Sequence, residues 1–303
     1  MEYEGETLLA VLAHPDDESF GMGGTLALYA RRGVAAHLVC ATRGEAGTVG
    51  AEHLHGYDSI ADLRVAELHC AAQTLGLAGV HFLDYRDSGM PGTPDNHHPR
   101  ALAAAPLEQV AGKVVAQIRS LRPQVVVTFD PIGGYKHPDH IAVNKATLQA
   151  FFQAGDPNYH DGLVPYQPQK LYYQTIPKAF LRFVVWGMPL FGKDPQRFGR
   201  NGDINLAELV EDGNFPTHAR IAYNPVADVK EAASECHSSQ IPSGPPRNRP
   251  MRWVQYLAGN REYYMRAYPP PQPRLRERDL FAGVALSPGR TEASAWVGVG
   301  SSS

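Results

Sequence analysis

The sequence predicts an α/β fold, a Rossmann-like and mostly parallel sheet with helices on both faces, followed by a smaller C-terminal extension. Short apolar runs such as TLLAVLA (7–13) and QVVVTFD (124–130) have the uniform hydrophobicity of strands that are buried on both faces. These runs alternate with helical patterns, as right-handed β-α-β crossovers require. Polar or charged residues follow each of four expected strands, where ligands bind in such sheets, so the pattern also indicates an enzyme.

The expected elements follow in chain order. The first half has strands at 7–13, 35–42, 80–85 and 124–130, and helices at 24–32, 61–75 and 106–121. Beyond about residue 155 the pattern loosens, and we expect strands at 170–177 and 219–224, a helix at 226–238 and a Pro-rich loop at 241–250. The predicted parts are a metal-site core at 1–155, a part at 156–270 that completes the sheet and the substrate pocket, and a C-terminal arm and tail at 271–303. The arm is expected to dock through Leu280 and Phe281.

Composition limits the possible function classes. Hydrophobic residues make up 43% of the 303 residues, which is typical of a globular protein. The formal net charge of −3, without a run of Lys or Arg, argues against nucleic acid or an anionic membrane as a partner. No run approaches the ~18 apolar residues of a membrane span, and the first residues lack the pattern of a signal peptide. We therefore expect a cytoplasmic protein.

The three cysteines and one glycine-rich run do not indicate a catalytic or cofactor-binding role. Cys40, Cys70 and Cys236 are odd in number and widely spaced, which predicts reduced thiols rather than a disulfide scaffold or a thiolate zinc site. A Cys-His nucleophile is not supported, because adjacent Cys236 and His237 cannot face each other on one helix. The run at 21–24 lacks the full dinucleotide fingerprint, so a nicotinamide enzyme is not indicated.

Two short motifs carry the candidate metal ligands. The strand at 7–13 runs into HPDD, whose acidic residues are costly to bury unless water or a cation covers them. His14 and Asp17 stand three apart across a proline-containing turn, so both can point into one crevice. In HPDH, His137 and His140 stand three apart at the start of a helix, on one face. Each motif alone also suits a solvated turn or a helix cap, but three ligands with one open position are typical of catalytic zinc.

Six segments in order resemble one known family. They are AHPDDES (13–19), TRGEAG (42–47), DLRVAEL (62–68), YRDSGM (85–90), GGYKHPDH (133–140) and KEAASECHSSQ (230–240). Together they resemble the PIG-L/LmbE family of zinc-dependent N-acetylglucosaminyl deacetylases, and within it the mycothiol-pathway branch. That resemblance implies a Rossmann-like fold and one Zn²⁺ per chain held by His14, Asp17 and His140. The same ligand set also suits Fe²⁺, Co²⁺ or Mn²⁺.

The resemblance also implies catalytic roles. Asp16 matches the family's general base, and His137 matches the residue that stabilises the oxyanion or protonates the leaving amine. Asp139 would orient a neighbouring imidazole, and Tyr135 would lie over the scissile carbonyl. These roles agree with general chemistry, because a carboxylate beside a metal ligand can take a proton from water and an imidazole can stabilise a negative charge.

Substrate contacts are less specific. The resemblance implies Arg64 and Asp87 as residues that hold sugar or aglycone hydroxyls, although spacing alone favours a surface pair between Arg64 and Glu67. Glu45, Ser19 and Met90 are further candidates from the same segments. His237 ends an expected helix, where a protonated ring interacts favourably with the helix dipole. We favour this role for His237 over metal ligation.

The predicted function is removal of the N-acetyl group from a small GlcNAc conjugate. GlcNAc-inositol and GlcNAc-malate remain open as substrates, and so does cleavage of a thiol S-conjugate amide at the same site. Lys136, Lys178 and Arg182 are a weak indication of an anionic aglycone such as malate. From another class, a catalytically inactive sugar-binding module remains an alternative. The aromatic-rich stretch at 180–191 could form a lid, a core element or a contact in a homo-oligomer.

Overall fold

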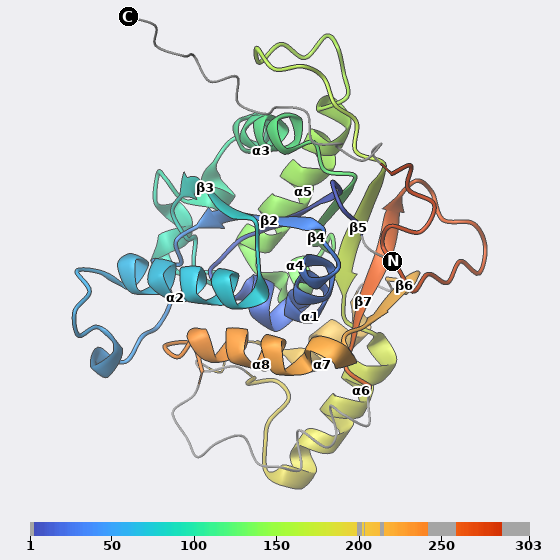
Figure 1. Cartoon of the computed structure of the whole chain (residues 1–303). Coiled ribbons are helices and arrows are strands. Elements are labelled where there is room, and N and C mark those ends of the chain that lie inside the picture. The colour runs from blue at the N-terminus through green and yellow to red at the C-terminus, as the bar shows by residue number, and fades with distance from the viewer. Residues whose placement is uncertain (1–2, 199–201, 203, 213–214, 242–258, 287–303) are drawn as a thin grey trace, which may run out of the picture.

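A mixed sheet flanked by helices forms the centre of the computed structural model, which describes residues 3–198, 202, 204–212, 215–241 and 259–286 (Figure 1). Within these residues the sheet has seven strands in the order β3-β2-β1-β4-β5-β7-β6. The strands are β1 (Thr7–Leu12), β2 (Ala35–Thr42), β3 (Gly79–Tyr85), β4 (Val125–Phe129), β5 (Lys170–Thr175), β6 (Ala219–Ala222) and β7 (Arg261–Tyr268). The predicted mostly parallel α/β fold is confirmed, because the first five strands all pair in parallel.

The helices cover both faces of the sheet, as parallel strands buried on both sides require. In Figure 1, α3 and α5 lie on one face, and α1, α2 and α8 lie on the other. The helices are α1 (Asp17–Arg31), α2 (Ile60–Leu75), α3 (Leu107–Leu121), α4 (Gly133–Lys136), α5 (Pro138–Gln153), α6 (Lys178–Gly187), α7 (Leu206–Glu211) and α8 (Ala227–Cys236). No helix in the described ranges is both long and apolar enough to cross a membrane.

Strand order places the candidate site. β1 pairs on one side with β2, to which the chain turns through α1, and on the other side with β4. The connections that leave β1 and β4 therefore diverge to opposite faces of the sheet, which opens a crevice at their carboxyl ends. HPDD follows β1 and HPDH follows β4, so the two motifs meet at this crevice.

The second half of the chain differs from the expected pattern in one strand and two helices. β7 was not predicted, because its sequence REYYMRAY mixes charged and aromatic residues. This composition suits its position, since β7 pairs antiparallel with both β5 and β6 near the edge of the sheet. Helices α6 and α7 were also missed. The loop expected at 241–250 and the end of the tail lie almost entirely outside the described residues, whereas Leu280 and Phe281 are buried in the core as predicted.

The prediction of three reduced cysteines is wrong for two of them. Cys70 on α2 and Cys236 at the end of α8 form a disulfide, with their Cα atoms 5.8 Å apart, and Cys40 is a buried free thiol. The two bonded residues are 166 positions apart in sequence, so their spacing gave no sign of the pair. Packing of α2 against α8 brings them together (Figure 1).

Candidate active site

The three predicted metal ligands have polar atoms that converge at the crevice between β1 and β4. His14 Nδ1 lies 3.3 Å from His140 Nε2 and 3.6 Å from Asp17 Oδ2. The second oxygen of Asp17, Oδ1, lies 3.3 Å from His140 Nε2. Both histidines are buried, and Asp17 is nearly so.

The donor set fits a divalent cation. Nitrogen and oxygen ligands that stand about 2.0–2.1 Å from tetrahedral zinc lie about 3.3 Å from one another, and the three separations are close to that value. The charge balance also fits, since the only Arg or Lys side chain in the described ranges that pairs with the surrounding carboxylates is Arg64. Those carboxylates belong to Asp16, Asp17, Asp87 and Asp139. Two further groups of possible ligands share His14, one with His137 and His140 and the other with Asp87 and Asp139, and each could hold a metal ion.

Asp139 fixes the orientation of His14. Its Oδ2 lies 3.1 Å from His14 Nε2 and also accepts the backbone N–H of Ser88 at 2.9 Å. Asp87 Oδ1 stands farther from the same ring nitrogen, at 3.5 Å. Burial opposes a charge on His14, but the carboxylates of Asp87, Asp139 and Asp17 raise its pKa well above the usual value. In the neutral form of the ring, a proton on Nε2 faces Asp139 and leaves the lone pair of Nδ1 directed at the ligand cluster.

His137 and Tyr135 lie beside this cluster. The His137 ring meets His14 edge-on, with 4.5 Å between centroids, and the Tyr135 ring stands 5.0 Å from that of His140. Burial, together with the charges of His14 and His140, lowers the pKa of His137 to about 2. His137 Nδ1 accepts the backbone N–H of Asp139 at 3.2 Å, so the neutral ring carries its proton on Nε2 and can donate a hydrogen bond.

Asp16 occupies a strained turn between β1 and α1. Its φ of 121° lies in the region that favours glycine, and such strain persists only where neighbouring groups hold the backbone. Asp16 Oδ2 accepts a hydrogen bond from Arg64 Nη2 at 2.9 Å. Burial raises the pKa of Asp16 to about 6, with Arg64 acting in the opposite direction. The carboxylate therefore changes charge close to neutral pH.

The loop that carries Tyr135 is shaped by Asp130 and Gly133. Asp130 Oδ1 accepts backbone N–H groups of Ile132 and Gly134, at 3.1 and 2.9 Å. Gly133 has a φ of 67°, and a Cβ there would stand 2.8 Å from the Cβ of His140. Glycine at this position lets the loop pass close to a candidate ligand.

The structure places the other candidates around the crevice in different ways. Arg64 is buried and binds Asp16 and the backbone oxygens of Pro15 and Gly44, so the alternative of a surface pair with Glu67 is wrong. Glu45 and Asp87 are joined, because Glu45 Oε2 accepts the Asp87 backbone N–H at 3.0 Å. The Met90 side chain is half-buried.

Ser19 is engaged with the neighbouring residue Glu18. Its side chain is fully buried and donates to Glu18 Oε1 at 2.6 Å. Glu18 also binds His237, so sequence reasoning missed two residues that lie directly behind the Asp16 turn. The acidic residue in AHPDDES and the histidine in CHSSQ were visible in the sequence, but nothing in their spacing linked them.

Comparisons with known proteins agree with this geometry. The family description "PIG-L: GlcNAc-PI de-N-acetylase" matches residues 9–151. The 1D-myo-inositol 2-acetamido-2-deoxy-alpha-D-glucopyranoside deacetylase of Acidothermus cellulolyticus is 37% identical over 289 residues, which cover 92% of this chain and 95% of the relative. That identity extends well beyond the matched family segment.

Solved structures with lower identity show the same fold. The 4-carboxy-2-hydroxymuconate hydratase GalB of Pseudomonas putida matches with a TM-score of 0.58 and 20% identity, over 89% of this chain and 99% of its own. The N,N'-diacetylchitobiose deacetylase of Pyrococcus horikoshii matches with a TM-score of 0.57 and 20% identity, over 86% and 83%. By its motifs, its fold and the similarity over nearly its full length, the chain belongs to the PIG-L family.

Proposed function

We propose that this protein is a zinc-dependent N-deacetylase that acts on a GlcNAc-inositol conjugate. The observation that carries the proposal is the convergence of His14, Asp17 and His140 on one point at the crevice, with Asp16 in the same turn. His14 Nδ1, Asp17 and His140 Nε2 would hold the metal, and Asp139 would hold His14 in place. A bound zinc ion supplies Lewis acidity, which polarises an amide carbonyl and makes water more acidic.

Asp16 is the proposed general base. Its pKa of about 6 leaves the carboxylate mostly ionised at neutral pH and still basic enough to take a proton from the attacking water. Arg64 holds one carboxylate oxygen, Oδ2, which leaves Oδ1 as the proton acceptor. The strained backbone of Asp16 keeps this group beside the ligands His14 and Asp17 without making it a ligand itself.

His137 is the proposed oxyanion donor. As a neutral ring with its proton on Nε2, it can donate a hydrogen bond to the oxygen that gains negative charge during attack on the amide. Tyr135 would cover the acetamide side of the crevice. Collapse of the tetrahedral species yields acetate and a free amine, and the proton taken by Asp16 is available to the leaving nitrogen.

Two observations favour inositol over malate as the aglycone. The relative from Acidothermus is named for a GlcNAc-inositol substrate. The indication of an anionic aglycone also weakens, because Lys136 pairs with Glu208 and Asp212, and Lys178 donates to the backbone oxygen of Glu211 at 3.2 Å. Of the three basic residues, two are thus engaged within the protein.

An amine-release assay tests the proposal. Purified protein is incubated with GlcNAc-inositol, GlcNAc-malate, free GlcNAc and a thiol S-conjugate, each with and without chelator. We expect chelator-sensitive release that is fastest for GlcNAc-inositol. Preferred cleavage of GlcNAc-malate or of the S-conjugate would overturn the substrate assignment, and binding of the sugars without release would favour the inactive binding module.

A further inference from the structure

Glu18 is a fully buried carboxylate directly behind the Asp16 turn. Its Oε2 accepts the backbone N–H of Asp16 at 3.0 Å, and its Oε1 accepts the Ser19 hydroxyl at 2.6 Å. A buried carboxylate is stable only when donors satisfy it, so the orientation of Glu18 depends on what else binds Oε1. The backbone N–H of Asp16 in turn depends on Glu18 Oε2, because Asp16 has a strained backbone conformation that neighbouring groups must hold.

His237 supplies the remaining donor. Its Nε2 lies 2.7 Å from Glu18 Oε1, and the side chains of both residues are fully buried. The ring packs against Phe20 with 5.8 Å between centroids, which limits its rotation. No bond of His237 to the proposed metal ligands exists in the described part of the chain, so the hydrogen-bonded connection of the ring to the site runs through Glu18.

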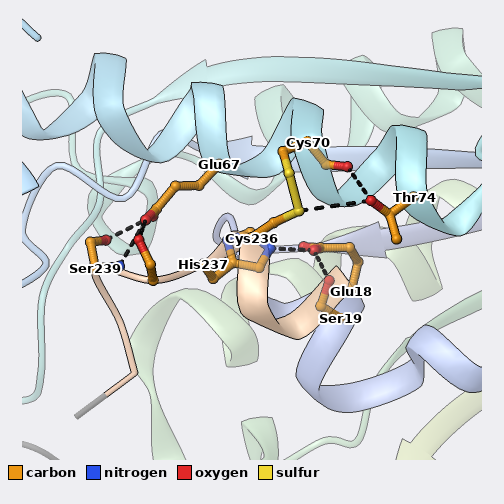
Figure 2. Close-up of a disulfide and its surroundings, with 9 residues drawn as sticks. Glu18, Ser19, Glu67, Cys70, Thr74, Cys236, His237 and Ser239 are labelled. Carbon is orange, nitrogen blue, oxygen red and sulfur yellow. Dashed lines mark hydrogen bonds and ion pairs between the residues drawn. A yellow bond between two sulfur atoms is a disulfide. The ribbon is translucent and has the colours of Figure 1, made fainter. Parts of the chain in front are cut away.

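Helix α2 holds the segment that carries His237 (Figure 2). Cys236, the residue before His237, is covalently joined to Cys70 of α2. Glu67, one turn earlier on α2, accepts the backbone N–H of Ser239 at 2.8 Å and its hydroxyl at 2.7 Å. The disulfide and these hydrogen bonds thus fix the chain to α2 on both sides of His237.

The same face of α2 also reaches Asp16 directly. Arg64, Glu67 and Cys70 are spaced three apart and therefore lie along one stripe of the helix. Arg64 binds the Asp16 carboxylate, while the other two hold the end of α8. Helix α2 therefore holds the side chain of Asp16 directly, and it holds the backbone of Asp16 indirectly, through His237 and Glu18.

We propose that His237 is a positioning residue, which acts through Glu18 to hold the turn that carries Asp16, and that the disulfide fixes the place from which it acts. The inference rests on the proposed deacetylase function. It assigns a role to the CHSSQ segment that neither metal ligation nor simple helix capping explains.

The test compares wild type with His237→Ala, His237→Gln and His69→Ala. Glutamine keeps an N–H donor of similar reach, and His69 is an exposed residue of α2 that serves as a matched control. For amine release from GlcNAc-inositol, we expect His237→Ala to lower kcat by about 10-fold or more, with KM within about 2-fold and bound metal unchanged. His237→Gln should recover most of that loss, and His69→Ala should match wild type.

Amide hydrogen exchange of the peptide that covers residues 14–20 separates this inference from the function itself. His237→Ala should speed exchange there whether or not the protein is active on the chosen substrate. If wild type releases no amine from any GlcNAc conjugate, the proposed function fails, and the exchange data still decide on the positioning role. Unchanged exchange, wild-type kcat in His237→Ala, or a loss that glutamine does not restore would each overturn the inference.

A second measurement covers the case in which His237→Ala does not fold. Dithiothreitol reduces the disulfide to two thiols and is itself oxidised to its cyclic disulfide. Reduced wild type should show faster exchange over residues 14–20 and a lower kcat. A Cys70→Ser/Cys236→Ser variant should show both changes without the reductant. Because this variant has no disulfide to reduce, any further change that dithiothreitol causes in it reports removal of metal by the reductant. Identical exchange in the reduced and oxidised forms would contradict the role of the disulfide.

Discussion

Asp16 shows how single residues can prepare a reactive group. Burial raises its pKa to about 6, the Arg64 guanidinium limits that rise, and the turn at φ 121° holds the carboxylate next to two candidate ligands. Of these features, the acid and its place beside His14 are visible in the sequence. The ion pair with Arg64 is not, because an arginine in an amphipathic helix is normally expected at the surface.

Replacement of Asp16 by alanine tests the assignment of the base. We expect Asp16→Ala to lower kcat by about 10²-fold or more, because the attacking water loses its proton acceptor. Metal content should remain that of wild type, as measured by elemental analysis. Glu108→Ala, at an exposed acid of α3, is the matched control. Retained activity in Asp16→Ala would show that another group takes the proton.

Replacement of Asp139 tests the support of a ligand. Without Asp139 Oδ2, His14 loses the acceptor that fixes its orientation, so Asp139→Ala should weaken metal affinity by about 10–100-fold. Competition against a coloured chelator measures this affinity. Asp95→Ala, which removes an acid paired with Arg86, should leave it unchanged. Equal affinities of Asp139→Ala and wild type would contradict the proposed support.

At the scale of elements, α2 and α8 are held together by chemistry that no local pattern reveals. Ser59 caps the start of α2 and Gly76 ends it in the left-handed conformation, so the bounds of the helix are encoded locally. Cys70 on this helix is bonded to Cys236 at the end of α8, which is 166 residues away in sequence. Pairing of this kind depends on which helices the sheet order brings together, and spacing alone cannot specify it.

Loss of the disulfide should destabilise the protein. A link that closes a loop of 166 residues restricts the unfolded chain, so the Cys70→Ser/Cys236→Ser variant should lose about 2–5 kcal/mol in free energy of unfolding. Denaturant titration measures the loss, and reduction of wild type should reproduce it. Alkylation of unreduced, unfolded wild type should label Cys40 alone. Labelling of all three cysteines would show that the bond does not form.

A pair of histidines between the neighbouring strands β2 and β3 predicts that the stability of the protein depends on pH. His37 Nδ1 lies 3.2 Å from His81 Nε2. Burial lowers the pKa of both rings, and the charge of His81 further lowers that of His37. The unfolded chain therefore binds protons more readily than the folded one, so this pair costs stability as the pH falls below about 6.5.

A variant isolates this pair from other titrating groups. Between about pH 7.5 and about pH 5, wild type should lose more free energy of unfolding than His81→Asn, in which one ring no longer titrates. Denaturant titrations at both pH values give the comparison. An equal loss in the two proteins would mean that the pair does not contribute.

For the whole molecule, the sequence predicted the parallel half of the sheet and the place where the two candidate motifs meet. Buried parallel strands have a local signature, and the rule that ligands bind at their carboxyl ends brings HPDD and HPDH together without further information. What remained hidden were long-range relations: the antiparallel β7, the bond between Cys70 and Cys236, and the pair of Glu18 with His237. Each joins residues that are far apart in sequence, so only the folded chain shows them.

The fold alone does not determine the reaction. A hydratase and a deacetylase both share it with this chain, so the proposed activity depends on the residues at the crevice. Part of the aromatic-rich stretch at 180–191 is a core element, because Leu181 and Met188 are buried in a second, smaller hydrophobic cluster. Its large aromatic side chains are not, because Phe183, Trp186 and Phe191 are 61%, 70% and 81% exposed. A homo-oligomer that covers this surface stays a prediction.

Metal reconstitution is the most direct test of the central claim, that His14, Asp17 and His140 hold one metal ion on which amide hydrolysis depends. Chelator-treated protein is titrated with Zn²⁺ while amine release from GlcNAc-inositol is followed. Activity should rise from near zero and level off at about one zinc per chain, and His14→Ala should not recover it under the same conditions. Full activity in metal-free protein, or full recovery by His14→Ala, would contradict the account.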